Sequence, residues 1–164
     1  MTTQLMIFLS CLAVISSGLV SGVFLAFSDF VMKSFATATK PGGIEAMQVI
    51  NRQVYRSVFL ALLMGTAPFS LLLAALAWVF IPGPAAAWLI GGSVIYWLGV
   101  ILVTLACNVP MNLRLDPMDR DAPDSQIYWM TYLSSWTRWN HVRVIASAGS
   151  SVCFLAGSLA LGQG

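Results

Sequence analysis

The sequence has very few charged residues. Of its 164 residues only 9% are Asp, Glu, Lys or Arg, and 59% are hydrophobic, whereas a soluble domain carries about 25% charged residues. Three long stretches, 5–28, 57–113 and 144–164, contain no charged residue at all. This composition excludes an ordinary water-soluble domain, and the net charge of +2 is too small to indicate a nucleic-acid partner. The lipid bilayer is the expected solvent.

The uncharged stretches are long enough for four membrane-spanning helices. One span needs about 20 apolar residues, so the first and last stretches hold one span each. The middle stretch holds two, divided at Pro82-Gly83-Pro84, because the two prolines cannot continue a helix. We therefore predict an all-α, membrane-embedded four-helix bundle in a single domain, 1–164, with spans at about 5–31, 55–81, 85–108 and 142–162.

Cysteine and histidine are also scarce. Cys11, Cys107 and Cys153 each lie in an apolar stretch and form no CxxC pair, which argues against a disulfide framework or a zinc site. His141 is the one histidine, and no His or Cys joins the eight methionines at a spacing that would suit a metal. We therefore predict no cofactor, with a haem b ligated by His141 as the alternative.

The few charges gather in the first and third loops. Both loops are rich in basic residues, and all six carboxylates also lie in or beside them. By the positive-inside rule we expect both loops in the cytoplasm and both termini outside, and helical spans favour the inner (cytoplasmic) membrane. The loops, of about 25 and 30 residues, are long for helix connections. We expect them to contain short interfacial helices, including the aromatic segment 126–143.

Two amides flank a proline at the inner end of the third span. Pro110 cannot donate a hydrogen bond to the carbonyl of Ala106, so we expect the helix to bend or end there. Asn108 and Asn112 are four residues apart and share a face if the helix continues. Amides at membrane depth need partners, so these two either tie the bundle together or belong to a site.

A second polar group leads into the fourth span. His141 can act as a general base near neutral pH, and the permanently charged Arg143 can hold an oxyanion. Trp139 lies four residues before Arg143 and can stack on it. The alternative is that these residues only anchor the helix at the membrane interface.

The first loop adds a polar helix face. Gln48, Asn51 and Tyr55 recur at helical spacing, and tryptophans of the third loop offer flat surfaces for an apolar aromatic small molecule. The predicted substrate-binding residues are Gln48, Asn51, Tyr55, Trp136 and Trp139. Gly18 and Gly22 form a GxxxG pattern, which permits close helix packing within the bundle or in a homo-oligomer.

Taken in order along the chain, these motifs resemble the anthrone oxygenase family of small four-helix membrane proteins. The resemblance covers essentially the whole chain. It implies an oxygenase that inserts oxygen at the activated methylene of a polycyclic anthrone, giving an anthraquinone, without a known need for metal or flavin. The polar signature it implies consists of Asn51, Asn108, Asn112, Trp139, His141 and Arg143.

The residues themselves are compatible with this chemistry. An anthrone methylene is acidic because its anion is a stabilised phenolate. We predict that His141 takes the proton, that Arg143 with Asn108 or Asn112 holds the enolate oxygen, and that the carbanion reacts with dioxygen. Two other functions stay open: a membrane protein that binds haem, a quinone or another flat cofactor, and a non-catalytic membrane subunit or small transporter.

Overall fold

The computed structural model describes residues 3–163, which form helices and short turns with no strand among them. The α-helices are α1 (Thr3–Ala26), α2 (Met32–Thr37), α3 (Lys40–Gln53), α4 (Val58–Phe80), α5 (Pro84–Tyr96), α6 (Val109–Leu115) and α7 (Pro123–Gly162). Three wider π-helical segments are η1 (Phe27–Val31), η3 (Trp97–Leu102) and η4 (Thr104–Asn108), and η2 (Val54–Arg56) is a 3-10 turn. The predicted all-α class is confirmed.

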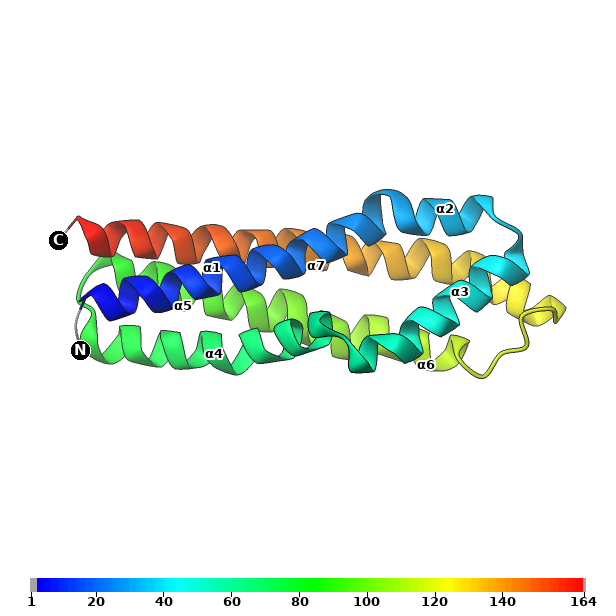
Figure 1. The fold of residues 1–164 in the computed structure, drawn as a ribbon, viewed down its shortest axis with the longest axis horizontal. Helices are drawn as coiled ribbons and strands as arrows, with labels where there is room; N and C mark the ends of the chain where they lie inside the picture. Colours follow the sequence, from blue (N-terminus) through cyan, green and yellow to red (C-terminus); the bar gives the residue numbers. More distant parts are fainter. Residues whose placement is uncertain (1–2, 164) are drawn as a thin grey trace.

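Four long helices dominate the chain, because π-helical segments join α1 to α2 and α5 to α6 without a break. They cover 3–37, 58–80, 84–115 and 123–162, and all four are long and apolar enough to cross a membrane. The helices run side by side, with the chain ends near the turn between α4 and α5, and with α2 and α3 at the opposite end (Figure 1). The chain is therefore a multi-pass membrane protein with the expected four-helix bundle.

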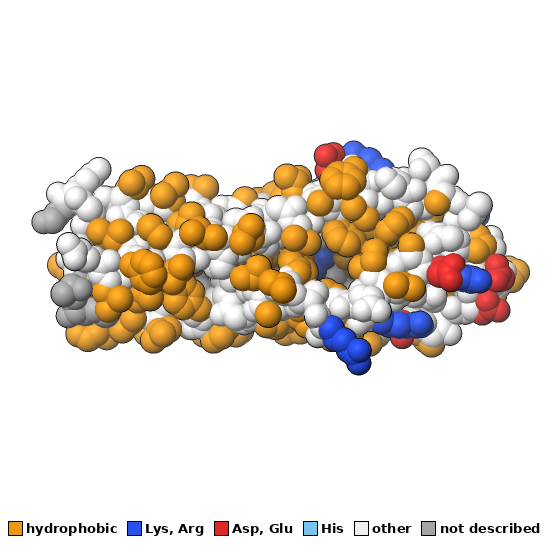
Figure 2. Space-filling model, viewed as in Figure 1, with side chains coloured by type: hydrophobic (Ala, Val, Ile, Leu, Met, Phe, Trp, Pro, Cys, Tyr) orange, Lys and Arg blue, Asp and Glu red, His pale blue; other side chains and the backbone are white. Residues whose placement is uncertain are grey.

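The bundle is longer than a membrane is thick. At about 1.5 Å per residue, α7 with its 40 residues is about 60 Å long, twice the roughly 30 Å of the hydrocarbon core. Charged side chains gather toward the α2–α3 end, and the described part of the other end shows no charged side chain on the face drawn in Figure 2. We call the charged half, residues 29–57 and 111–138, the extension.

The extension corrects one prediction about the third loop. We expected about 30 residues of loop with an interfacial segment, but only residues 116–122 lie outside a helix, and 123–143 is the first half of α7. The physical reason is that its aromatic residues pack inwards. Trp129 stacks on Tyr132 with ring centroids 5.4 Å apart, and Tyr132 stacks on Trp136 at 6.0 Å. The first loop does contain short helices, α2 and α3.

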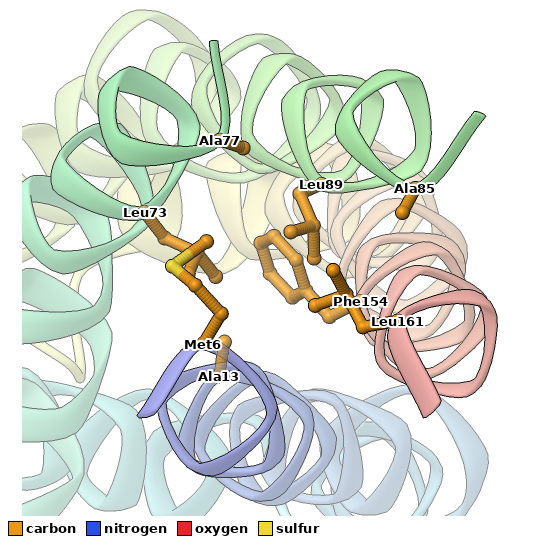
Figure 3. Packing of buried hydrophobic residues seen from close by; sticks show 8 residues of the cluster. All are labelled: Met6, Ala13, Leu73, Ala77, Ala85, Leu89, Phe154 and Leu161. Carbon is orange, nitrogen blue, oxygen red and sulfur yellow. The ribbon is translucent and has the colours of Figure 1, made fainter. Parts of the chain in front are cut away.

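The hydrophobic half has its own core at the end away from the charges. All four long helices contribute to it, and Figure 3 shows how their side chains meet. Its buried members are Met6, Ala13, Leu73, Ala77, Ala85, Leu89, Phe154 and Leu161. Here α5 and α7 approach closely, since a Cβ atom at Gly92 would lie 2.8 Å from Cε1 of Phe154. The GxxxG pattern matters less, because Gly22 has no side-chain neighbour within 4 Å among the described residues.

The third span continues through Pro110, so the helix does not end there. In η4 the backbone N–H of Val109 donates to the carbonyl of Thr104, five residues earlier. This wider register places Pro110 in the first turn of α6, where a missing N–H is tolerated. The π-helical segment therefore lets the helix accommodate the proline.

Candidate functional site

A cavity of about 590 Å³ lies where the hydrophobic half of the bundle meets the extension. Side chains of α1, η1, α3, α4, η4, α6 and α7 all reach it. Its apolar walls include Phe24, Phe27, Met47, Phe59, Leu60, Leu63 and Val109. Its polar or charged lining residues include Asn51, Thr104, Asn112, Asp116 and Arg143. This size and composition are typical of a site for a drug-sized, mostly apolar ligand.

The rim of the cavity has a polar part, with the exposed Arg52, Gln53 and Tyr55, and an apolar part. Met64 on α4 is 39% exposed, and Leu105 on η4 and Leu113 on α6 are 54% and 63% exposed. Figure 2 shows a hollow at the level where the hydrophobic and charged surfaces meet, with Lys or Arg atoms visible inside it. The cavity therefore has an exposed, apolar edge between α4 and the η4–α6 helix.

Arg143 is a buried cation in the wall of this cavity, with only 5% of its surface exposed. Its Nη2 donates to Oδ1 of Asn140 at 2.7 Å, and its Nη1 donates to Oγ1 of Thr104 at 3.4 Å. The guanidinium lies 4.2 Å from the ring centre of Phe24 and 5.1 Å from that of Trp136. Among residues 3–163, no carboxylate is within ion-pair distance of Arg143, and its Nε has no hydrogen-bond partner.

Two predicted substrate-binding residues of the first loop also line the cavity. Asn51 on α3 is 8% exposed, and its Nδ2 finds no hydrogen-bond partner in the described part of the chain. Tyr55 on η2 is exposed at the rim. Asn51 and Arg143 thus each bring to the cavity wall a side chain with one buried nitrogen that has no partner among the described residues, and an unpaired buried donor is costly.

The two amides around Pro110 meet partners on α7, as predicted for polar groups at membrane depth. Oδ1 of Asn112 accepts from Oη of Tyr132 at 2.7 Å and from Nε1 of Trp136 at 2.8 Å. Nδ2 of Asn108 donates to the carbonyl of Trp136 at 3.2 Å. Asn112 and Trp136 line the cavity, and Asn108 is buried outside its lining. Asn112 therefore holds the Trp136 ring in the cavity wall, and Asn108 ties η4 to the backbone of α7 at the same residue.

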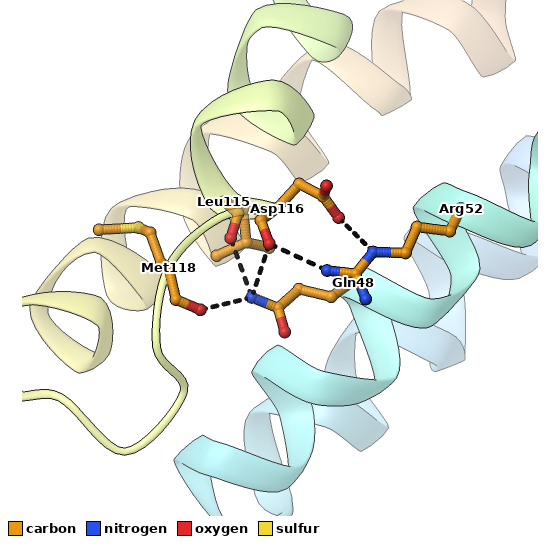
Figure 4. A network of polar contacts seen from close by, with 5 residues as sticks. All are labelled: Gln48, Arg52, Leu115, Asp116 and Met118. Atoms are coloured by element: carbon orange, nitrogen blue, oxygen red, sulfur yellow. Dashed lines mark hydrogen bonds and ion pairs between the residues drawn. The ribbon is translucent and has the colours of Figure 1, made fainter.

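Gln48 stabilises a turn and does not line the cavity. Its Nε2 donates to the carbonyls of Leu115 and Met118 at 3.0 and 2.8 Å, as Figure 4 shows. One helical turn later, Nε of Arg52 donates to Oδ1 of Asp116 at 2.8 Å. These contacts join α3 to the end of α6, and the amide nitrogen of Gln48 is occupied in them.

His141 lies outside the cavity, in a separate groove of about 210 Å³ that Lys33 and Thr137 also line. Trp139 is 40% exposed and does not line the cavity either. The reason is helical geometry: residues two apart differ in direction by about 200°, so His141 and Arg143 point to opposite sides of α7. Of Asn51, Asn108 and His141, only Asn51 itself lines the cavity, although the segments around all three reach it.

A comparison with known protein families bears on this site. A model of the anthrone oxygenase family matches residues 53–153, which is more than half of the chain. The chain belongs to the anthrone oxygenase family. The matched part includes α4 and the cavity residues Thr104, Asn112, Trp136 and Arg143. No curated protein and no solved structure matches the chain.

Sequence reasoning missed three polar residues of this anthrone oxygenase family member. Thr104 and Asp116 line the cavity, and Asn140 holds Arg143. The sequence spacing could have indicated Asn140, since it lies three residues before Arg143 and so on the same face of a helix. Thr104 sits in an apolar run and carries no comparable signal.

A metal ligand set is not found in the described part of this family member. Within residues 3–163, no group of three or more His, Cys, Asp and Glu side chains is placed to hold a metal ion. The alternative of a haem ligated by His141 gains no support from the large cavity, because His141 does not line it.

Proposed function

We propose that this protein is a membrane-embedded oxygenase that acts on a polycyclic aromatic, anthrone-type or quinone-like substrate. The observation that carries the proposal is Arg143, a buried cation without a carboxylate partner in the wall of an apolar cavity. Such a wall suits a flat apolar molecule with one oxygen that becomes negatively charged during the reaction. The opening between α4 and the η4–α6 helix allows such a molecule to enter from the bilayer.

The proposed reaction needs only dioxygen as co-substrate. A base removes one proton of the anthrone methylene, and the resulting charge is delocalised onto the carbonyl oxygen, where Arg143 and the amide of Asn51 stabilise it. The carbanion carbon then bonds to dioxygen, and the hydroperoxide that forms loses water. Anthrone and dioxygen thereby give anthraquinone and water, so that atoms and electrons balance.

The base of this reaction is proposed to be Asp116. It is the one carboxylate among the described residues that line the cavity, and its side chain is 41% exposed at the water-facing end. Arg52 holds it in place. His141, predicted from the sequence as the base, stays the alternative, although reaching a ligand in the cavity would require α7 to rotate.

The orientation in the membrane belongs to the same proposal. We propose that the extension faces the cytoplasm, that both termini face outside, and that the protein resides in the inner (cytoplasmic) membrane. The support is the gathering of charged side chains at the α2–α3 end (Figure 2), together with the positive-inside rule.

Oxygen uptake by the purified protein, with emodin anthrone as the probe, tests the proposed function. We expect uptake well above the spontaneous rate, and a loss of about 100-fold or more in Arg143→Met, because removing one oxyanion donor typically costs that much. Asp116→Asn should lower the rate strongly, whereas His141→Ala should keep it. Full activity of Arg143→Met would overturn the proposal, and an inactive His141→Ala beside an active Asp116→Asn would return the base to His141. A visible absorption spectrum tests the haem alternative.

A further inference from the structure

Asn140 holds Arg143 in place without neutralising it. Its side chain is fully buried, and its Oδ1 accepts the 2.7 Å hydrogen bond from Nη2 of Arg143. The other contacts of the guanidinium are also uncharged, namely the hydroxyl of Thr104 and two aromatic faces. Neutral groups of this kind reduce the cost of burying a cation but leave its charge uncompensated.

The orientation of the Asn140 amide is fixed from the opposite side. Its Nδ2 donates to the carbonyl of Phe24 at 2.7 Å and to Oγ of Ser28 at 2.6 Å. Phe24 lies in the last turn of α1, and Ser28 belongs to the π-helical segment η1. A flipped amide would place its oxygen against the Phe24 carbonyl and its nitrogen against the guanidinium, so only the observed orientation satisfies all three contacts.

The charges that line the cavity do not balance. Three charged side chains of the described residues reach it: Arg52, Asp116 and Arg143. Arg52 and Asp116 form an ion pair with each other, so Arg143 alone is left without an opposite charge. The cavity lining is thus one negative charge short of neutrality.

We infer that the cavity binds its ligand as a monoanion, with one ionised phenolate or enolate oxygen against Arg143, and that Asn140 is the positioning residue that keeps this charge available. The flat aromatic shape of the ligand rests on the proposed function. The negative charge of the ligand is inferred only from Arg143 and its neutral surroundings. The site therefore selects the ionised form of a hydroxylated or enolisable aromatic over a neutral molecule of the same shape.

A matched ligand pair tests this selection in the full chain, reconstituted in lipid nanodiscs. The probes are 2-hydroxyanthraquinone and unsubstituted anthraquinone, with binding followed by quenching of tryptophan fluorescence at pH values above and below the ionisation of the hydroxyl. We expect the ionised probe to bind at least about tenfold more tightly than anthraquinone, because a buried charge pair contributes more than a factor of ten to affinity. Equal affinities in the wild type would overturn the inference.

Asn140→Asp tests the positioning role. The new carboxylate pairs with Arg143, so the preference for the ionised probe over anthraquinone should vanish, and its second oxygen faces the carbonyl of Phe24, so we also expect a lower Tm. Gln126→Glu, the matched change on α7 outside the cavity lining, should keep the preference. If Asn140→Asp retains the full preference, Asn140 does not set the charge. If Asn140→Asp does not fold, the inference stands only if Arg143→Gln abolishes the preference for the ionised probe.

These binding measurements separate the inference from the proposed function. Neither probe has a methylene to oxidise, so binding is recorded without turnover. A protein that prefers the ionised probe but shows no oxygen uptake with emodin anthrone would keep the inference and lose the oxygenase proposal. Oxygen uptake without any preference between the probes would keep the oxygenase proposal and contradict the inference.

Discussion

At the scale of single residues, Asn112 shows how one amide oxygen organises two aromatic side chains. Both Oη of Tyr132 and Nε1 of Trp136 donate to it, and both side chains are buried. Trp136 in turn lies beside the guanidinium of Arg143. The shape of the cavity wall therefore depends on an acceptor at position 112.

Replacing this acceptor should destabilise the protein. In Asn112→Leu both donors lose their partner, and each unsatisfied buried group costs about 1 to 3 kcal/mol. We expect a clearly lower Tm in detergent for Asn112→Leu and a nearly unchanged Tm for Asn112→Asp, which keeps an oxygen at the same place. Thermal unfolding followed by tryptophan fluorescence measures both. An unchanged Tm in Asn112→Leu would show that these two hydrogen bonds contribute nothing.

Of the site residues predicted from the sequence, Asn51, Tyr55, Asn112, Trp136 and Arg143 line the cavity, and the role of each stays a prediction. The sequence analysis placed His141 and Arg143 in one site because they are close in sequence, but the structure separates their side chains. His141 is only two residues from Arg143, and that separation on a helix sends the side chains in opposite directions.

At the scale of elements, glycines set the packing of α5 against α7. A Cβ atom at Gly92 would meet the ring of Phe154 at 2.8 Å, and one at Gly157 would meet Leu89 at 2.6 Å. Phe154 and Leu89 are fully buried in the same core, so they have little room to move away. Two glycines on facing helices thus make room for two large side chains.

Gly92→Ala should therefore loosen the bundle. Overpacking of a well-packed core costs about 1 to 3 kcal/mol, and we expect a lower Tm by the same fluorescence measurement. Gly91→Ala is the matched control, because a Cβ atom there meets nothing within 4 Å among the described residues. The two variants gain the same methyl group and the same helix propensity, so their difference isolates the packing cost. Equal Tm values would contradict close packing at Gly92.

Element positions were more predictable than element ends. The four apolar runs gave the number of helices because charge is excluded from a span. The first half of α7 was missed as a continuous helix, since its aromatic residues were expected at the lipid interface, whereas Trp129, Tyr132 and Trp136 form a buried stacked row. The π-helical segments were also missed, because their wider hydrogen-bond register leaves no clear mark on residue spacing.

At the scale of the whole molecule, the bundle has a hydrophobic half and a charged half, with the cavity at their junction. In the orientation proposed above, the apolar opening would lie within reach of the bilayer and the Arg52–Asp116 ion pair would lie toward water. A ligand in the cavity would then lie between lipid and water. The proposed substrate would enter from lipid, and its proton would pass to water at the same site.

Cysteine labelling along α7 tests this division and its orientation. Ser134 in the extension and Val152 in the hydrophobic half are both exposed, and they lie about 27 Å apart along the helix. In a background with Cys11, Cys107 and Cys153 replaced by serine, we expect a membrane-impermeant maleimide to label Ser134→Cys in inside-out vesicles only. Val152→Cys should stay unlabelled in both vesicle types until the membrane is dissolved in SDS. Labelling of Ser134→Cys only from the outside would reverse the proposed orientation, and protection in both vesicle types would mean that the extension is embedded in lipid.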